Sequence, residues 1–125
     1  MIDHLTLDDV LAAAEAHLGH PAEVGDYGLL QSAVARPQAT VYGEDAYSTI
    51  HQQAAALLQS LAANHALVAG NKPTAFMATA LFYALNGHHV PGRLEDELFD
   101  LVLAVATREL DTVQTIAVRL SRLVE

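Results

Sequence analysis

The stretch that decides the fold runs from Ser48 to Gly87 and reads STIHQQAAALLQSLAANHALVAGNKPTAFMATALFYALNG. Alanine and leucine dominate both of its halves, and these residues favour helix. The pattern predicts one helix from a cap at Ser48 through about Asn64, and a second helix over roughly 73–86. The second helix is apolar nearly all round, so we expect it at the centre of the domain.

The rest of the chain continues the helical pattern. We expect further helices over roughly 7–18, 27–35 and 94–107, and a last one opened by a variant capping box at Asp111. Residues 38–47 are expected to form an exposed loop or a short hairpin. No linker divides the sequence, so residues 1–125 are predicted to form one all-α domain, a compact bundle of around six helices with a central buried helix.

The composition excludes several classes of protein. The chain has 125 residues, of which 52% are hydrophobic, and this is enough for one core. Only 6 Lys and Arg stand against 15 Asp and Glu, so direct binding to nucleic acid or to an acidic membrane is not expected. The absence of cysteine excludes disulfides and thiolate catalysis. Without a recognisable signal peptide or membrane span, we expect a cytoplasmic protein.

The break between the two apolar helices, residues 65–74, is the one segment that could carry chemistry. Gly70 and Asn71 both tolerate a left-handed turn, and the helix that follows offers unpaired backbone N–H groups to an anion. Lys72 adds a positive charge, and His65 is able to accept a proton near neutral pH. The segment therefore indicates either a phosphate-binding site with a general base or an ordinary helix junction.

The motif His65-Ala66-Leu67-Val68-Ala69-Gly70-Asn71-Lys72-Pro73 resembles the signature loop of the Fic/Doc family. It is most similar to the death-on-curing (Doc) branch, whose usual pattern is H-x-F-x-D-G-N-K-R. Residues 28–40, 54–65 and 74–87 fit the same family, and the resemblance covers roughly residues 5–120.

The resemblance implies a compact helical Fic fold and a toxin from a bacterial toxin–antitoxin pair. It further implies transfer of a phosphoryl group from ATP to a Ser or Thr hydroxyl of a translation factor similar to elongation factor Tu. The partner would be a Phd-like antitoxin. AMP transfer is the alternative reaction, but that pattern carries G-N-G-R and a second Arg, where this chain has Lys72 and Met77.

The resemblance also assigns expected roles to single residues. His65 stands where the family has its general base, and Lys72 matches the lysine of the Doc branch. We expect Gly70, Asn71, Lys72 and Thr74 to bind ATP, and His65 and Lys72 to act in catalysis.

Two departures from the family pattern bear on activity. Ala69 stands where the family has the acid that holds Mg²⁺, and Pro73 stands where it has the arginine that clamps phosphate oxygens. Alanine offers no ligand to a hard cation, and proline offers neither charge nor N–H. We therefore expect weak or absent turnover and no protein ligand for the metal. The alternative is a binding module with a Fic fold and no catalysis.

Two other residues stand out. Arg36 comes directly before Pro37 and is expected to cap a helix or pair locally rather than contact substrate. His51 lies near the start of the third helix, where its spacing assigns it no role.

Overall fold

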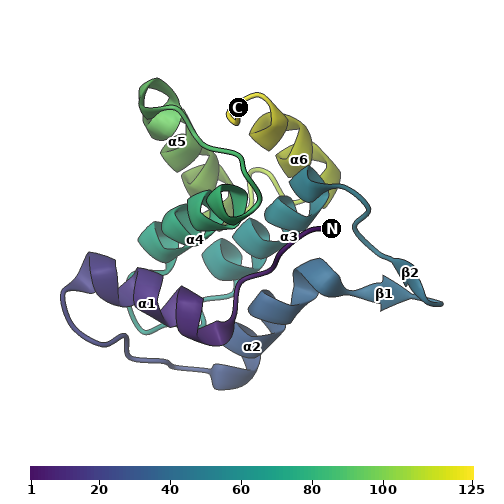
Figure 1. Ribbon diagram of the computed structural model, residues 1–125. Coiled ribbons are helices and arrows are strands. Elements are labelled where there is room, and N and C mark those ends of the chain that lie inside the picture. The colour runs from purple at the N-terminus through teal and green to yellow at the C-terminus, as the bar shows by residue number, and fades with distance from the viewer.

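A computed structural model describes all residues, 1–125, and shows a bundle of six α-helices with one short hairpin (Figure 1). The helices are α1 (Leu7–Leu18), α2 (Tyr27–Ala35), α3 (Ile50–Ala63), α4 (Asn71–Leu85), α5 (Glu95–Ala106) and α6 (Val113–Ser121). Two short 3₁₀ turns, Arg36–Gln38 and Gly92–Leu94, follow α2 and precede α5. The expected all-α bundle is confirmed. No helix is both long and apolar enough to cross a bilayer.

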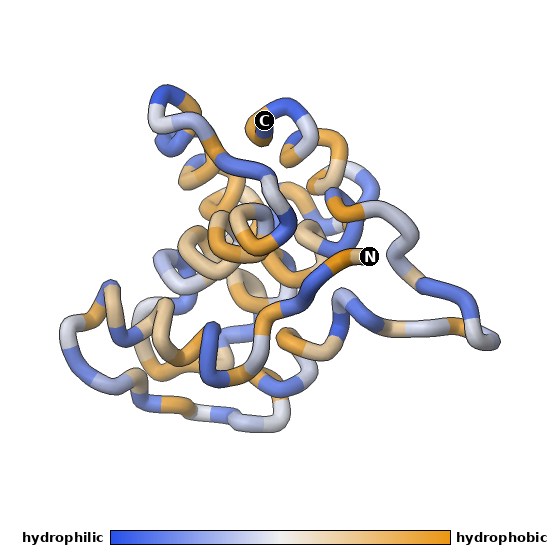
Figure 2. Tube along the Cα trace, viewed as in Figure 1, coloured by the Kyte–Doolittle hydropathy of each residue, from blue (hydrophilic) through white to orange (hydrophobic).

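Helix α3 occupies the centre of the bundle, and α2, α4, α5 and α6 all pack against it. Ten of its 14 residues are buried, most of them alanine and leucine. Small alanines on several sides let neighbouring helices approach closely. Figure 2 shows hydrophobic colour over the middle of the bundle, where the helices meet. The expectation that the fourth helix forms the centre is wrong. Helix α4 packs on α3 but leaves Leu81 and Leu85 exposed.

Hydroxyl and carboxylate side chains start most of the helices. Thr6 caps α1 in a capping box with Asp9, and Asp26 caps α2 by accepting a hydrogen bond from the N–H of Leu29. Two caps lie one residue later than the sequence indicated: Thr49 rather than Ser48 starts α3, and Thr112 rather than Asp111 starts α6. In both cases a threonine with extended backbone follows directly and places its hydroxyl over the third N–H of the helix.

The segment 38–47 forms a short hairpin, one of the two structures that the sequence predicted for it. Strand β1 (Thr40–Val41) pairs antiparallel with β2 (Glu44–Asp45), and Figure 1 shows the hairpin projecting from the bundle. Every residue of both strands is exposed. The four strand residues therefore contribute no side chain to the core.

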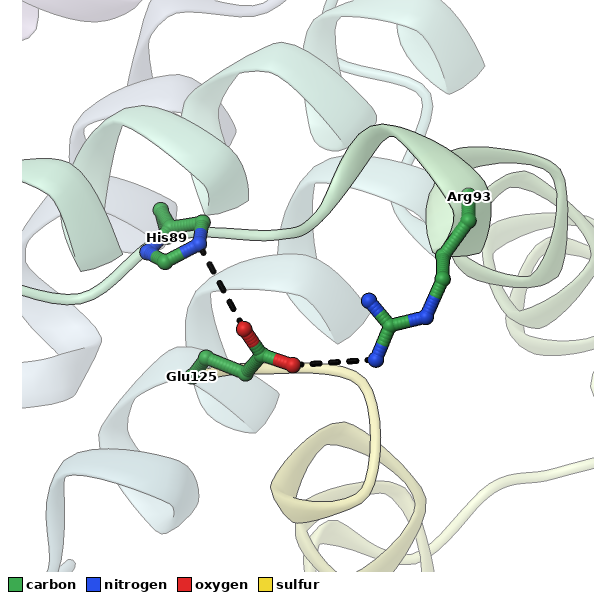
Figure 3. A network of polar contacts seen from close by, with 3 residues as sticks. All are labelled: His89, Arg93 and Glu125. Carbon is green, nitrogen blue, oxygen red and sulfur yellow. Dashed lines mark hydrogen bonds and ion pairs between the residues drawn. The ribbon is translucent and has the colours of Figure 1, made fainter.

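The end of the chain is tied to the loop between α4 and α5 (Figure 3). His89 and Glu125 exchange two backbone hydrogen bonds of 2.9 Å each. The Glu125 carboxylate also accepts a hydrogen bond from Arg93 at 3.0 Å and lies 3.7 Å from the His89 ring. The backbone pairing orders the last residues, since exposed ion pairs contribute little by themselves.

Candidate functional site

The junction between α3 and α4 contains two residues with left-handed backbone. Asn64 ends α3, and His65 follows with φ +51°. Gly70 precedes α4 with φ +81°, a conformation that glycine adopts without the steric cost of a Cβ. Helix α4 therefore begins at Asn71, two residues earlier than predicted.

The loop between these two points is held against the connector between α1 and α2. The carbonyl oxygen of Ala66 accepts hydrogen bonds from the N–H groups of Gly25 and Asp26, at 2.9 and 3.0 Å. The N–H of Val68 donates to the carbonyl oxygen of Glu23 at 2.9 Å. These bonds fix the path of the loop, so the connector helps to position His65 and Gly70 at the two ends of the loop.

The side chain of Asn71 forms two hydrogen bonds with the backbone of the loop. Its amide donates to the carbonyl oxygen of Leu67 at 2.8 Å and accepts from the N–H of Leu67 at 3.0 Å. The amide thus serves the loop and is not available to a ligand. This refines the sequence-based expectation that Asn71 binds ATP, since only its backbone N–H can do so.

His65, Gly70, Asn71, Lys72 and Pro73 line one hollow of about 170 Å³. His65 and Lys72 are exposed, and the ring of His65 has no hydrogen-bond partner. The backbone N–H groups of Asn71 and Lys72 form no hydrogen bond either, because they lie in the first turn of α4 and Gly70 supplies no capping side chain. The hollow thus combines an imidazole, an ammonium group and a positive helix end, which together favour an anion.

Thr74 does not belong to this hollow. Its side chain is 1% exposed, its hydroxyl forms no hydrogen bond, and its N–H donates to the carbonyl oxygen of Gly70 at 3.0 Å. One turn into α4, the helical rotation directs this position toward the core. Its hydroxyl is buried and its N–H is already paired, so the structure gives no support to the expectation that Thr74 binds ATP, which stays a prediction.

The hollow offers no evident metal site. None of its five lining residues carries a carboxylate, and no cluster of three or more His, Asp or Glu residues suited to a metal exists anywhere in the chain. Ala69 is exposed beside Gly70 and has no ligand atom in its side chain. The Mg²⁺ that the family resemblance implies therefore has no protein carboxylate to hold it here.

A histidine–tyrosine pair lies away from the hollow and was not anticipated from the sequence. The Tyr83 side chain is fully buried, and its hydroxyl lies 2.7 Å from Nδ1 of His51. Burial raises the pKa of Tyr83, so this hydroxyl keeps its proton, and the tautomer of the His51 ring decides which of the two groups donates. Burial, with a smaller contribution from nearby His88, lowers the pKa of His51 below 6.5. No spacing rule links positions 51 and 83, which meet only because α3 and α4 pack together.

Arg36 has a structural role, as expected. Its guanidinium donates to the Tyr47 hydroxyl at 3.0 Å, to Gln59 at 2.8 Å and to Ser60 at 3.0 Å. It also lies over the Tyr47 ring, 5.5 Å from the centroid. The arginine thereby joins the end of α2, the base of the hairpin and α3.

The largest open groove runs between α1 and α4. It has a volume of about 550 Å³, and seven of its eight lining residues are hydrophobic. Phe76 and Leu81 of α4 form one side, and Ala12 and Ala13 of α1 form the other. Such a groove suits the apolar face of an added helix.

Comparison with known proteins agrees with this architecture. Residues 4–83 match the model of the Fic/DOC family. The chain is also similar to a protein named Toxin Doc from Mycolicibacterium smegmatis, with 52% identity over 112 residues, which cover 89% of this chain and 86% of the relative. The family match spans α1 to α3, most of α4 and the junction with its hollow. The chain therefore belongs to the Fic/DOC family.

Proposed function

We propose that this chain is the toxin of a toxin–antitoxin pair and that its hollow at the start of α4 holds the phosphates of ATP. In this proposal the chain transfers a phosphoryl group to a Ser or Thr hydroxyl of a translation factor similar to elongation factor Tu, in the cytoplasm. The observation that carries it is the convergence of His65, Lys72 and two unpaired N–H groups on one hollow. The similarity to a protein named Toxin Doc supports the assignment as a toxin.

The size of the hollow limits what it can enclose. Pockets that bury a whole drug-sized ligand measure about 300–1,000 Å³. At about 170 Å³, this hollow has room for phosphate groups but not for a complete nucleotide. We therefore expect Lys72 and the N–H groups of Asn71 and Lys72 to bind phosphate oxygens, while the nucleoside lies outside on the surface.

The proposed reaction needs one proton acceptor. His65 takes the proton from the target hydroxyl, whose oxygen attacks the γ-phosphorus of ATP. The bond between this phosphorus and the β–γ bridging oxygen breaks, and ADP leaves with the electron pair. Because the ring of His65 forms no hydrogen bond within the chain, either ring nitrogen is free to accept the proton.

Turnover should be slow in this chain. Ala69 and Pro73 replace an acid and an arginine that the family pattern has, and both contribute to charge neutralisation in phosphoryl transfer. By analogy with single donors lost from other active sites, each replacement costs on the order of 10²–10³ in rate. The two costs need not add, because such groups act together.

The groove between α1 and α4 is the proposed binding site for the antitoxin. Its lining is almost entirely apolar and is built from exposed or half-buried residues such as Phe76, Met77 and Leu81. An amphipathic helix from a Phd-like antitoxin would cover this apolar surface. This groove is also the observation that favours a second candidate, a Fic-fold binding module that recognises its partner without catalysis.

The test is transfer of label from ATP to purified elongation factor Tu and to a bacterial lysate. We expect label from γ-³²P ATP, weak for the natural chain and at least ~10²-fold stronger for the double variant Ala69→Asp, Pro73→Arg. Label from α-³²P ATP would instead indicate AMP transfer. A His65→Ala change in the double variant is the control and should abolish the signal. If the double variant transfers no label and does not slow growth, the chain is a binding module.

A further inference from the structure

We infer that this chain binds the triphosphate of ATP without a divalent cation, and that Mg²⁺ weakens the binding instead of supporting it. The inference rests on the proposed function, since it concerns the ligand state that the same hollow takes. The family resemblance implies Mg²⁺, but the atoms around the hollow do not fit this ion.

The lining residues do not offer the oxygen ligands that Mg²⁺ needs. Mg²⁺ requires oxygen ligands in near-octahedral geometry and is usually held by one or two carboxylates together with phosphates and water. The hollow has no carboxylate. The side-chain oxygen of Asn71 already accepts the N–H of Leu67, and the carbonyl oxygen of Gly70 already accepts the N–H of Thr74.

The carboxylates of the connector do not take part in the hollow. Neither Glu23 nor Asp26 lines it, and the Asp26 carboxylate accepts the N–H of Leu29 as the cap of α2. Moving the Asp26 carboxylate into the hollow would leave that helix end without its cap.

The positive groups favour the more highly charged form of the nucleotide. Lys72 and the N-terminal end of α4 stabilise negative charge on the phosphates, and ATP without Mg²⁺ carries two more negative charges than its Mg²⁺ complex. A bound Mg²⁺ also occupies phosphate oxygens that Lys72 and the N–H groups would otherwise contact. Because both effects act in the same direction, saturating Mg²⁺ should weaken binding by about three- to tenfold at low salt.

The experiment measures binding directly. ATP is titrated into the full chain by calorimetry, with the amide signals of Asn71 and Lys72 followed by NMR, once in EDTA and once in excess MgCl₂. We expect binding in EDTA and a dissociation constant about three- to tenfold larger in MgCl₂. Binding that requires Mg²⁺, or that tightens with it, overturns the inference and leaves the proposed function intact. No binding under either condition overturns both.

Variants at one exposed position provide the matched comparison. Ala69→Asp adds a carboxylate beside Gly70, and Ala69→Asn adds an uncharged side chain of the same shape. We expect Mg²⁺ to tighten ATP binding only in the Asp variant. Lys72→Ala should weaken binding most strongly in EDTA, where it meets the full charge of the triphosphate. If Ala69→Asn and Ala69→Asp respond to Mg²⁺ in the same way, the missing carboxylate is not the cause.

Discussion

The side-chain amide of Asn71 forms hydrogen bonds with both backbone groups of Leu67. Nδ2 donates to the carbonyl oxygen at 2.8 Å, and Oδ1 accepts from the N–H at 3.0 Å. The amide thereby satisfies the backbone N–H and C=O of Leu67, a residue that is buried in the loop. A side chain that satisfies two buried backbone groups also fixes the first turn of α4, whose free N–H groups line the hollow.

Removal of this amide should loosen the loop. We expect Asn71→Ala to lower the free energy of unfolding by about 1–3 kcal/mol, because two hydrogen bonds are lost and two buried backbone groups of Leu67 remain unpaired. Urea unfolding of both proteins measures the difference. Asn64→Ala is the control, since Asn64 is exposed and its side chain forms no hydrogen bond. Equal effects of the two changes would contradict the role of Asn71.

The backbone at Gly70 gives a second prediction. Gly70 has φ +81°, and an added Cβ would lie 3.4 Å from a methyl group of Leu18, an ordinary contact. The cost of Gly70→Ala is therefore backbone strain and not steric overlap, and we expect about 1–2 kcal/mol lower stability. Gly92→Ala serves as the comparison, because a Cβ there meets open space and no positive φ is required. That variant should stay within about 0.5 kcal/mol of the natural chain in urea unfolding.

Arg36 should not tolerate lysine. Its planar guanidinium reaches the Tyr47 hydroxyl on one side and Gln59 and Ser60 of α3 on the other. A single ammonium group cannot span these acceptors, so Arg36→Lys should cost about 1–3 kcal/mol and increase proteolysis at the hairpin. The same change at exposed Arg119, whose side chain forms no hydrogen bond, should leave stability within about 0.5 kcal/mol. A neutral outcome at Arg36 would show that the hairpin does not depend on these bonds.

Much of the fold follows from local patterns. The limits of α1, with its cap at Thr6, and of α2, with its cap at Asp26, are predictable because capping side chains act within three residues of sequence. The centre of the bundle is not predictable in this way. Helix α4 is apolar all round, yet α3 is the surrounded helix, because burial depends on how many neighbours pack against each face.

The candidate site was predictable to a similar extent. Motif spacing identified His65, Gly70 and Lys72, which line one hollow. Thr74 belongs to the same motif, but one helical turn is enough to direct its side chain into the core. The motif also assigned Asn71 to a ligand, whereas the amide is bound to the loop. The local sequence predicts which residues lie close together, whereas the direction of each side chain depends on its position around the helix axis.

The pair of His51 and Tyr83 should make stability depend on pH. The Tyr83 hydroxyl and Nδ1 of His51 form a hydrogen bond of 2.7 Å, and burial of the His51 ring favours its neutral form in the folded state. Burial and nearby His88 lower the pKa of His51 below its unfolded value of 6.5. As the pH falls below 6.5, the unfolded chain therefore binds a proton before the folded chain does. This contribution to stability is fully present above that pH and is lost as the pH falls toward the folded-state pKa.

The measurement is the urea midpoint between about pH 7.5 and pH 5.5, a range that covers the titration of an unperturbed histidine. The variant His51→Asn keeps an acceptor for the Tyr83 hydroxyl but does not titrate, so the midpoint should fall less steeply with decreasing pH than in the natural chain. His17→Asn changes an exposed histidine of α1 whose side chain forms no hydrogen bond, and should retain the natural slope. If both variants show the slope of the natural chain, the proton that destabilises the fold binds elsewhere.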